Sequence, residues 1–412
     1  MNMTNLQANL NIATLGSVSD GKSEMIYQLS GVRTQRDSRE KKRNITIKAG
    51  YANIKLWICG QCNNQYSSND IPDYQCKICN NKCILNNYIS FTDCPGHQEL
   101  IETMLTSISL VHAAIVVISV VDQLTLKPQL LQHLVAAKMA NIEKIIICLN
   151  KCDLVTPQIV KQRKKELEII LDTLDIKPCI IIPTSFTQKL NISELIKGIN
   201  YYFTPSEINN ESSQNKSIFR ITRSFDINKP GTDIQLIKGG CIGGSLINGI
   251  FKLNDVVEIN PGILTKDKNG KYSCEPIITT LLSFESDKIN ITDMKKGGLI
   301  AIQSKIDPYY CKNDGLKGNI ITEIGQSIPV YHDIKILFNK LDYFETNWIP
   351  KNGDKIFLQI SNMFSEAKIT KNKNNILDIQ LVKPICIQND SKILIFIKNP
   401  ILKITGFGNL II

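Results

Sequence analysis

Residues 16–23, GSVSDGKS, follow the apolar run 11–15 and precede the helix-like run 24–29. They form the pattern G-x-x-x-x-G-K-[ST] between a strand and a helix, in which backbone N–H groups surround a phosphate. The helix start adds partial positive charge, and a chance glycine-rich turn is the alternative. The stretch predicts a P-loop in which Lys22 neutralises phosphate oxygens and Ser23 coordinates Mg²⁺. Its candidate nucleotide-binding residues are Gly16, Ser19, Asp20, Gly21, Lys22, Ser23 and Glu24.

A second motif, Asp93-Cys94-Pro95-Gly96-His97, follows the apolar strand pattern of residues 88–92. A strand that ends here brings the Asp93 carboxylate to the Mg²⁺ side and the Gly96 N–H to a γ-phosphate. An aspartate at a strand end is also a common turn or cap residue.

A third motif, Asn150-Lys151-Cys152-Asp153, follows the apolar run 144–149. The Asp153 carboxylate can accept hydrogen bonds from N1 and the 2-amino group of guanine, a pair that adenine does not offer. The motif therefore predicts GTP or GDP, although such a tetrapeptide is also a common surface turn. A fourth stretch ends the strand pattern 179–183 and closes over the base, with Ser185, Phe186 and Thr187 as candidates. Four such motifs in this order, each after an apolar strand, indicate a guanine-nucleotide site.

The composition indicates a large cytoplasmic protein. The chain has 412 residues, 43% of them hydrophobic, which suggests two or three domains with proper cores. Its start lacks the pattern of a secretory leader, and no apolar run reaches 18 residues, so no membrane association is expected. The net charge of +10 allows a polyanionic partner without identifying it.

Three domains are expected from the change of pattern along the chain. Residues 1–204 alternate strands and helices, which predicts an α/β domain with a doubly wound, mostly parallel sheet. A polar linker follows at 205–217. Two all-β barrels are then expected at 218–330 and 331–412, because short apolar runs and hairpin signals replace the alternation.

Two readings apply to the basic segment Arg33–Arg43. A charge run is commonly a solvated face. The functional reading is a switch loop that ends near Thr46, whose hydroxyl and carbonyl would meet Mg²⁺ and the γ-phosphate.

Four cysteines lie in an insertion at about 59–83, as C-x-x-C pairs at Cys59 and Cys62 and at Cys76 and Cys79. Two such knuckles can direct four thiolates at one tetrahedral Zn²⁺, a closed structural site. The metal would order a loop that has no core of its own. Two unrelated buried cysteine pairs are the alternative, and the role of Cys83 stays open.

These motifs resemble the translational GTPases, and among them the gamma-subunit family of eukaryotic and archaeal translation initiation factor 2. The resemblance continues through three stretches in the first barrel. It is weaker in the last domain, where residues 404–408 are the one matching stretch. The additional matching stretches are 43–48 with 50–53, 223–231, 238–245 and 305–308.

The resemblance implies a heterotrimer core that, with GTP bound, carries methionyl initiator tRNA to the small ribosomal subunit. It implies alpha and beta subunits, a GTPase-activating protein and a guanine-nucleotide exchange factor as partners. Tyr51, Arg220 and Arg223 are candidates to face the aminoacyl end of the tRNA. The alternatives are that Tyr51 packs on the sheet and that the two arginines are ordinary solvent-facing residues.

The P-loop departs from the family pattern, which usually has His at the positions of Ser17 and Asp20 and Thr at that of Glu24. A carboxylate near the phosphates repels them, so Asp20 predicts weak or altered nucleotide affinity. Glu24 is less of a departure if only its N–H is used.

The expected reaction is in-line attack of water on the γ-phosphate. Lys22 neutralises charge, Thr46 helps to hold Mg²⁺, and His97 orients or polarises the water. A histidine after a glycine is also commonly a hydrogen-bonding loop residue. No arginine finger is evident, so slow intrinsic turnover that needs a partner is expected. Two other functions stay open: an elongation-type factor for another aminoacyl-tRNA, and a Tu-like GTPase subunit of a metabolic enzyme such as that of sulfate activation.

Overall fold

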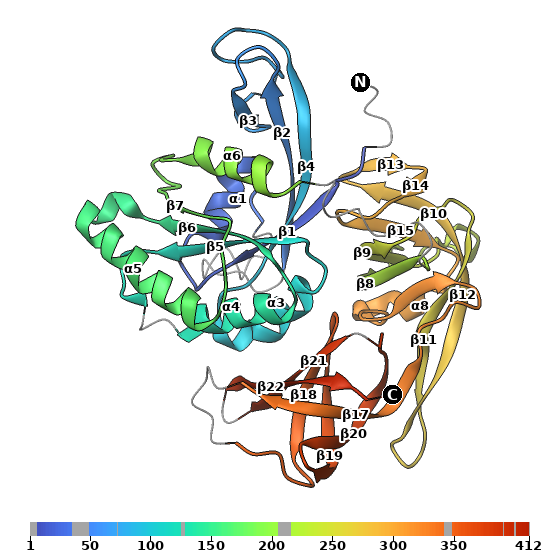
Figure 1. Cartoon of the computed structure of the whole chain (residues 1–412). Coiled ribbons are helices and arrows are strands. Elements are labelled where there is room, and N and C mark those ends of the chain that lie inside the picture. Colours follow the sequence, from blue (N-terminus) through green and yellow to red (C-terminus); the bar gives the residue numbers. More distant parts are fainter. Residues whose placement is uncertain are drawn as a thin grey trace. The chain divides into compact units, whose positions relative to one another are not determined.

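The computed structural model describes residues 6–34, 49–71, 73–124, 128–204, 216–341, 348–389, 391–398 and 401–411. The chain divides into two compact units. One contains the described residues from 8 to 204, and the other contains the described residues from 216 onwards together with residues 6 and 7 (Figure 1).

The first unit is built on a seven-stranded sheet with the order β3-β2-β4-β1-β5-β6-β7. β1 is parallel to β4 and β5, and the parallel pairing continues through β6 to β7. β2 is antiparallel to both β4 and β3, so the sheet is mixed at one edge. The strands are β1 Leu10–Leu15, β2 Gly50–Cys59, β3 Gln65–Ser67, β4 Cys83–Asp93, β5 Ala113–Ser119, β6 Lys144–Asn150 and β7 Ile180–Pro183.

Helices cover both faces of this sheet (Figure 1). Apolar side chains of α1 and α6 belong to one core with the strands, and α3, α4 and α5 lie on the opposite face. The strands β1 and β5 are buried along their whole length, as expected for parallel strands between two helix layers. The helices are α1 Lys22–Ser30, α3 Ile101–Ile108, α4 Pro128–Met139, α5 Pro157–Thr173 and α6 Ile192–Tyr202, with 3-10 turns η1 Gln98–Leu100 and η3 Cys152–Leu154.

The second unit begins with a barrel in which the sheet order is β11-β16-β8-β9-β15-β12-β13 and a β11–β12 pairing closes the ring. Its strands are β8 Ile218–Phe225, β9 Cys241–Asn248, β11 Val256–Lys266, β12 Tyr272–Ser286, β13 Ile289–Ile291, β15 Ile300–Ser304 and β16 Ile320–Glu323. A separate two-stranded sheet pairs β10 Phe251–Lys252 with β14 Asp293–Met294. The short helices are η4 Ile234–Leu236, α8 Pro308–Cys311 and η5 Lys312–Asp314.

A second closed barrel follows with the order β17-β20-β19-β18-β21-β22. Gly406 and Gly408 of β22 lie against β17, where an added Cβ would come within 2.3 Å of Phe338 and 2.5 Å of Ile336. The close packing of these two strands therefore requires glycine. The strands are β17 Val330–Lys340, β18 Lys355–Ile360, β19 Met363–Lys373, β20 Ile376–Cys386, β21 Lys392–Lys398 and β22 Leu402–Leu410.

The predicted fold class is confirmed: an α/β nucleotide-binding unit is followed by two closed all-β barrels. Predictions for residues 35–48, including the switch-loop reading and Thr46, lie outside the described residues, as does most of the predicted linker. In the parts of the chain that the structure describes, no helix combines the length and apolar character needed to span a membrane.

Candidate functional site

The P-loop curls between β1 and α1, at the carboxyl end of a buried strand. Gly16 and Gly21 have φ angles of 138° and 105°, which favour glycine. Lys22 bends back across the loop and donates hydrogen bonds to the carbonyl oxygens of Gly16 at 2.9 Å and Ser17 at 2.7 Å. Burial lowers the pKa of Lys22, and the nearby carboxylates of Asp93 and Asp20 oppose that shift. The loop therefore holds a buried amine at the place where phosphate charge is expected.

Asp20 turns its carboxylate into the protein. Oδ2 accepts a hydrogen bond from the Ser17 N–H at 2.7 Å, and Oδ1 accepts one from the Ser119 N–H at 3.1 Å. The side chain is almost fully buried. Asp20 therefore joins the P-loop to the end of β5, a role that the motif alone did not indicate.

His133 of α4 also contacts the P-loop, and no sequence motif predicted this contact. Its Nδ1 accepts a hydrogen bond from the Gly16 N–H at 2.9 Å, so this nitrogen carries no proton. Burial, with a smaller contribution from Lys22, lowers the pKa of His133 to about 3. A lone histidine in an apolar helix was the only sequence signal for this residue.

Three hydroxyl groups surround the Asp93 carboxylate at the end of β4. Ser23 Oγ donates to Oδ2 at 2.7 Å, Thr34 Oγ1 donates to the same oxygen at 2.6 Å, and Thr14 Oγ1 donates to Oδ1 at 3.0 Å. The predicted Mg²⁺ ligands Ser23 and Asp93 are thus in direct contact. Thr34 joins them although none of the four sequence motifs includes it. Carboxylate and hydroxyl oxygens are the ligands that Mg²⁺ prefers, so this donor set fits the ion.

Gly96 lies against the P-loop. An added Cβ would come within 2.5 Å of Lys22 Nζ and 2.7 Å of the Gly16 carbonyl oxygen, so only glycine fits here. The next residue, His97, is exposed, and its Nδ1 accepts a hydrogen bond from the Glu99 N–H at 3.4 Å. The backbone of the second motif therefore packs directly against the P-loop.

Asn150 connects the base-recognition motif to the P-loop. Its Nδ2 donates to the Asp20 carbonyl at 2.8 Å, and its Oδ1 accepts from the Phe186 N–H at 3.2 Å. The Phe186 ring is buried in the domain core, so this residue contributes its backbone at the site rather than a ring over a base. Asp153 is exposed at the same end of the sheet.

The other predicted nucleotide-binding residues lie around the contacts between these motifs. Lys151 has a φ angle of 65° at the turn after β6, and the Cys152 N–H donates to the Thr184 carbonyl. Ser185 and Thr187 contact each other through their hydroxyl groups at 3.5 Å. Ser19 is exposed with a φ angle of 63°, and Glu24 accepts a hydrogen bond from Gln28. The four motifs thus come together at the carboxyl ends of parallel strands, which is the geometry that a guanine nucleotide requires.

The four predicted zinc ligands form a cluster at the tip of the β2–β4 hairpin. Their sulfur atoms all lie within 4.8 Å of one another, a spacing that suits one tetrahedral Zn²⁺. The Cys59 and Cys79 sulfurs are 3.3 Å apart, and those of Cys62 and Cys76 are 3.4 Å apart. The donor set is thiolate only, as in closed structural sites.

Neighbouring groups favour the thiolate at Cys59 and Cys76 but not at Cys79. The Asn81 N–H lowers the pKa of Cys79, but the Cys59 sulfur and burial outweigh it and raise that pKa to about 12. Backbone N–H groups of Cys79 and Ile78, with the Tyr66 hydroxyl, lower the pKa of Cys76 to about 5. Asn64 Nδ2 donates to the Cys62 sulfur at 3.1 Å. Cys83 lies outside the group of four, and burial raises its pKa to about 11. The structure therefore groups four cysteines as possible ligands and places Cys83 in the small core behind them.

The three candidate tRNA contacts have other surroundings. Tyr51 pairs with Thr92 in the β2–β4 register. Arg220 donates to Gln388 at 2.6 Å, which connects the two barrels, and Arg223 forms an ion pair with Asp314 at 2.8 Å. Both arginines therefore already have partners within the second unit.

A P-loop domain with this base-recognition motif, followed by two barrels, defines the class of translational GTPases. Residues 7–205 match the family model "Elongation factor Tu GTP binding domain", and residues 343–399 match "Initiation factor eIF2 gamma, C terminal". In fold, the chain is similar to a bacterial selenocysteine-specific elongation factor EF-Sec, with a TM-score of 0.74 and 19% identity over 98% of this chain. The chain spans 58% of that structure. For the elongation factor SelB of Methanococcus maripaludis, the TM-score is 0.69 at 18% identity, over 100% of this chain and 79% of that one.

Similarity in sequence identifies a family within the class of translational GTPases. The chain is 31% identical to eukaryotic translation initiation factor 2 subunit gamma of Encephalitozoon cuniculi, over 98% of this chain and 93% of that protein. It is 33% identical to translation initiation factor 2 subunit gamma of Methanocaldococcus jannaschii, over 94% of each. The chain belongs to the gamma-subunit family of translation initiation factor 2 and is a GTP hydrolase of translation initiation.

Proposed function

We propose that this chain is a GTP-dependent carrier of methionyl initiator tRNA, in which hydrolysis of GTP releases the tRNA at the small ribosomal subunit. The observation that carries this proposal is the convergence of the P-loop, Asp93, Gly96 and Asn150 at one end of the sheet, in a chain of the gamma-subunit family. A site that contacts the terminal phosphate of GTP can change its conformation when that phosphate is lost. Such a change can control the binding of a second ligand.

In the proposed reaction, Lys22 neutralises charge on the phosphates and the Gly96 N–H contacts the γ-phosphate. Ser23, Asp93 and Thr46 would hold Mg²⁺, which supplies positive charge to the phosphates when it is bound. His97 would orient the attacking water. The guanine base would be read by Asp153, with Asn150 and Lys151 supporting that loop and residues 185–187 closing the pocket. The remaining P-loop candidates are Gly16, Ser19, Asp20, Gly21 and Glu24.

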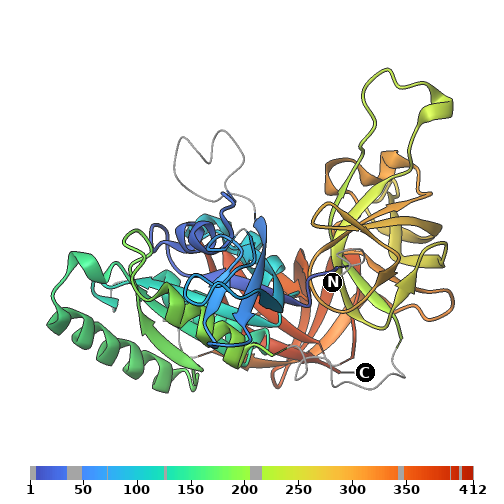
Figure 2. The same ribbon diagram turned by 90° about the horizontal axis from the view of Figure 1, so that it is seen from above.

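The name of the relatives, subunit gamma, supports membership in a multi-subunit factor. We propose alpha and beta subunits, a GTPase-activating protein and an exchange factor as partners. One surface supports subunit binding: a loop at residues 226–240 projects from the first barrel (Figure 2). Its base is closed by reciprocal hydrogen bonds between Asn228 and Lys238, each of 2.8 Å. Near its tip, Ile234 is 85% exposed and Leu236 is 70% exposed.

Three further assignments belong to this proposal. The cysteine cluster would bind a structural Zn²⁺. The domain limits would be 1–204, 218–330 and 331–412 with a linker at 205–217, supported by the start of β8 at Ile218 and of β17 at Val330. The compartment would be the cytoplasm. Tyr51, Arg220 and Arg223 stay candidates for tRNA contacts.

The deciding experiment measures binding of labelled initiator tRNA to the purified chain with a non-hydrolysable GTP analogue or with GDP, and with or without the methionyl group. We expect tight binding only with the GTP analogue and the methionylated tRNA. Equal binding with GDP would exclude a GTP-controlled carrier. A preference for another aminoacyl-tRNA would favour an elongation-type factor, and no tRNA binding would favour a metabolic GTPase subunit.

A further inference from the structure

Three lysines lie side by side on the outer face of the second barrel. β18 pairs with β19 so that Lys355 stands opposite Lys368. The register of β18 with β21 aligns Phe357 with Phe396, and continuing it places Lys398 opposite Lys355. All three side chains are exposed. Directly opposite residues on antiparallel strands have Cβ atoms about 5 Å apart, so this arrangement brings three like charges together and is destabilising by itself.

Acidic neighbours do not neutralise this lysine row. An ion pair between β17 and β20 joins Lys335 to Asp378 at 3.7 Å and does not include the row. Over the described residues, no ion pair involves Lys355, Lys368 or Lys398. The row therefore leaves concentrated positive charge available to an external anion.

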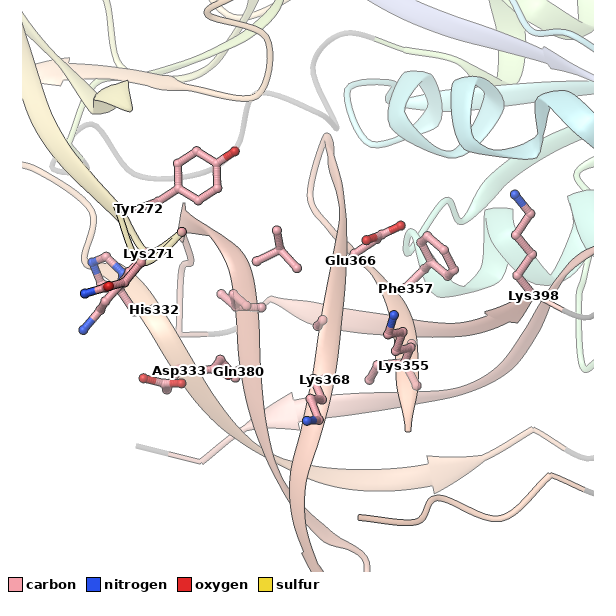
Figure 3. A pocket seen from close by; sticks show the side chains of 16 residues that line it. Lys271, Tyr272, His332, Asp333, Lys355, Phe357, Glu366, Lys368, Gln380 and Lys398 are labelled. Atoms are coloured by element: carbon pink, nitrogen blue, oxygen red, sulfur yellow. The ribbon is translucent and has the colours of Figure 1, made fainter. Parts of the chain in front are cut away.

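The lysine row borders a cavity of about 740 Å³ between the two barrels (Figure 3). The opposite wall is the tip of the β11–β12 hairpin, which contributes Lys271 and Tyr272. Two more lysines approach the Tyr272 ring: Lys266 Nζ is 5.5 Å and Lys383 Nζ is 6.0 Å from its centroid. Asp333 and Glu366 also line the cavity, against four lysines, so the lining is net positive.

Aromatic rings accompany these charges. Phe357 lines the cavity, is half-buried and stacks on Phe364 with centroids 5.7 Å apart and an interplanar angle of 16°. Neighbouring strands are about 4.8 Å apart, so the row from Lys398 to Lys368 covers roughly 10 Å. Charges spread over that length suit a chain of phosphates better than a single anion. Lysines interleaved with aromatic rings are the combination that binds the backbone and the bases of single-stranded nucleic acid.

We propose that this cavity, with Lys355, Lys368, Lys398, Lys271 and Tyr272, is a binding site for single-stranded RNA. The lysines contact the phosphates, and an aromatic ring provides a surface for a base. An acidic peptide would match the charge but would make no specific use of the rings. The site lies within the two barrels, and its proposal does not depend on initiator tRNA binding or on GTP.

The test measures the fluorescence anisotropy of a labelled 12-nucleotide oligouridine as the full chain is added in the presence of GDP. The use of GDP separates binding at this cavity from GTP-dependent tRNA binding. The variant Lys355→Gln/Lys368→Gln removes two charges from the row. The matched control Lys164→Gln/Lys197→Gln removes two exposed lysine charges from α5 and α6. We expect weaker binding for the first variant only, and a slope of log K against log salt that is smaller by about 1.4, since each lost phosphate contact removes about 0.7.

Tyr272 provides a second measurement. Tyr272→Phe keeps the ring and should bind the oligonucleotide like the wild type, whereas Tyr272→Ala should bind about fivefold or more weakly. Thermal unfolding of each variant tests for intact folding, and loss of lysine repulsion should leave the unfolding temperature of Lys355→Gln/Lys368→Gln unchanged or higher. Equal affinities for the row variant and its control would overturn the proposal. Binding of a polyglutamate peptide with no binding of the oligonucleotide would overturn it in favour of an acidic protein ligand.

Discussion

The carboxylate of Asp20 accepts a hydrogen bond from the backbone N–H of Ser119 at 3.1 Å. This contact connects the P-loop to the end of β5, across 99 positions of the chain. The second carboxylate oxygen accepts from the Ser17 N–H at 2.7 Å. Asp20 thus replaces an expected histidine with a buried acid whose charge is held by two amide dipoles.

Asp20 is predicted to weaken GTP binding. A unit charge near the phosphates costs roughly 1–2 kcal/mol at an effective dielectric constant near 20, so removing it should tighten binding about 5- to 30-fold. Asp20→His and Asp20→Asn should therefore bind GTP more tightly than the wild type in isothermal titration calorimetry. Asn has nearly the same size as Asp and removes the charge, but its amide nitrogen cannot accept, so it keeps only one of the two hydrogen bonds from Ser17 and Ser119. A wild-type dissociation constant no weaker than that of Asp20→His would contradict the prediction.

Asp153 is predicted to select guanine. Asp153→Asn replaces an acceptor with an amide that can donate to the 2-oxo group of xanthine, so GTP affinity should fall and xanthosine triphosphate affinity should rise. Hydrogen bonds to a charged group contribute about 1.5–3 kcal/mol each, so two lost bonds predict a decrease of at least about 100-fold. Competition binding with both nucleotides measures the change. Asp122→Asn, an exposed acidic residue after β5, serves as the control. Unchanged selectivity in Asp153→Asn would exclude the assigned role.

The cysteine cluster is predicted to hold one zinc ion. Cys62→Ser or Cys79→Ser should lower the metal content of the purified protein, measured by mass spectrometry, from one zinc per chain towards zero, and should destabilise the hairpin tip. Cys83→Ser is the matched control, since this thiol lies outside the four-sulfur group. Full zinc content in both ligand variants, or equal loss in the control, would show that the cluster is assigned wrongly.

His97 is predicted to act in hydrolysis and not in binding. Its side chain is exposed, so His97→Ala should fold normally. The single-turnover rate of GTP hydrolysis should fall about 100-fold or more, as for loss of a group that positions or polarises water, while GTP affinity changes little. His332→Ala in the second barrel tests for a general effect of losing a histidine. A rate like that of the wild type would leave His97 as a loop residue.

The sequence predicted those parts of the site whose residues follow an apolar strand within a short motif. Lys22, Asp93 and Asn150 each follow an apolar strand, and parallel strands end at one edge of a sheet, so their meeting could be expected. Thr34 and His133 could not be predicted in the same way. Their partners Asp93 and Gly16 are 59 and 117 positions away in the chain, and no motif surrounds either residue.

Similar reasoning applies to the barrels. Alternating apolar residues predicted all-β domains, but not the strand register. The row of Lys398, Lys355 and Lys368 exists only because two pairings fix that register. The alternating strand made Arg220 and Arg223 candidate tRNA contacts, with solvent-facing positions as the alternative, but it did not predict that each contacts a residue distant in sequence.

His133 is predicted to make the stability of the nucleotide-binding unit sensitive to acid. Its pKa is lowered to about 3 in the folded state, against an ordinary value near 6.5 when unfolded. The unfolded chain therefore binds more protons between these values, and the free energy of unfolding falls as the pH decreases from about 6.5 towards 3. His133→Gln should flatten this dependence in urea unfolding measured from pH 7 to 4. His97→Gln, an exposed histidine, should not. Because the pKa of His133 is about 3 in the folded state, Nδ1 stays unprotonated and keeps accepting the Gly16 N–H down to about pH 4, so the GDP affinity of the folded protein should change no more over this range in the wild type than in His133→Gln.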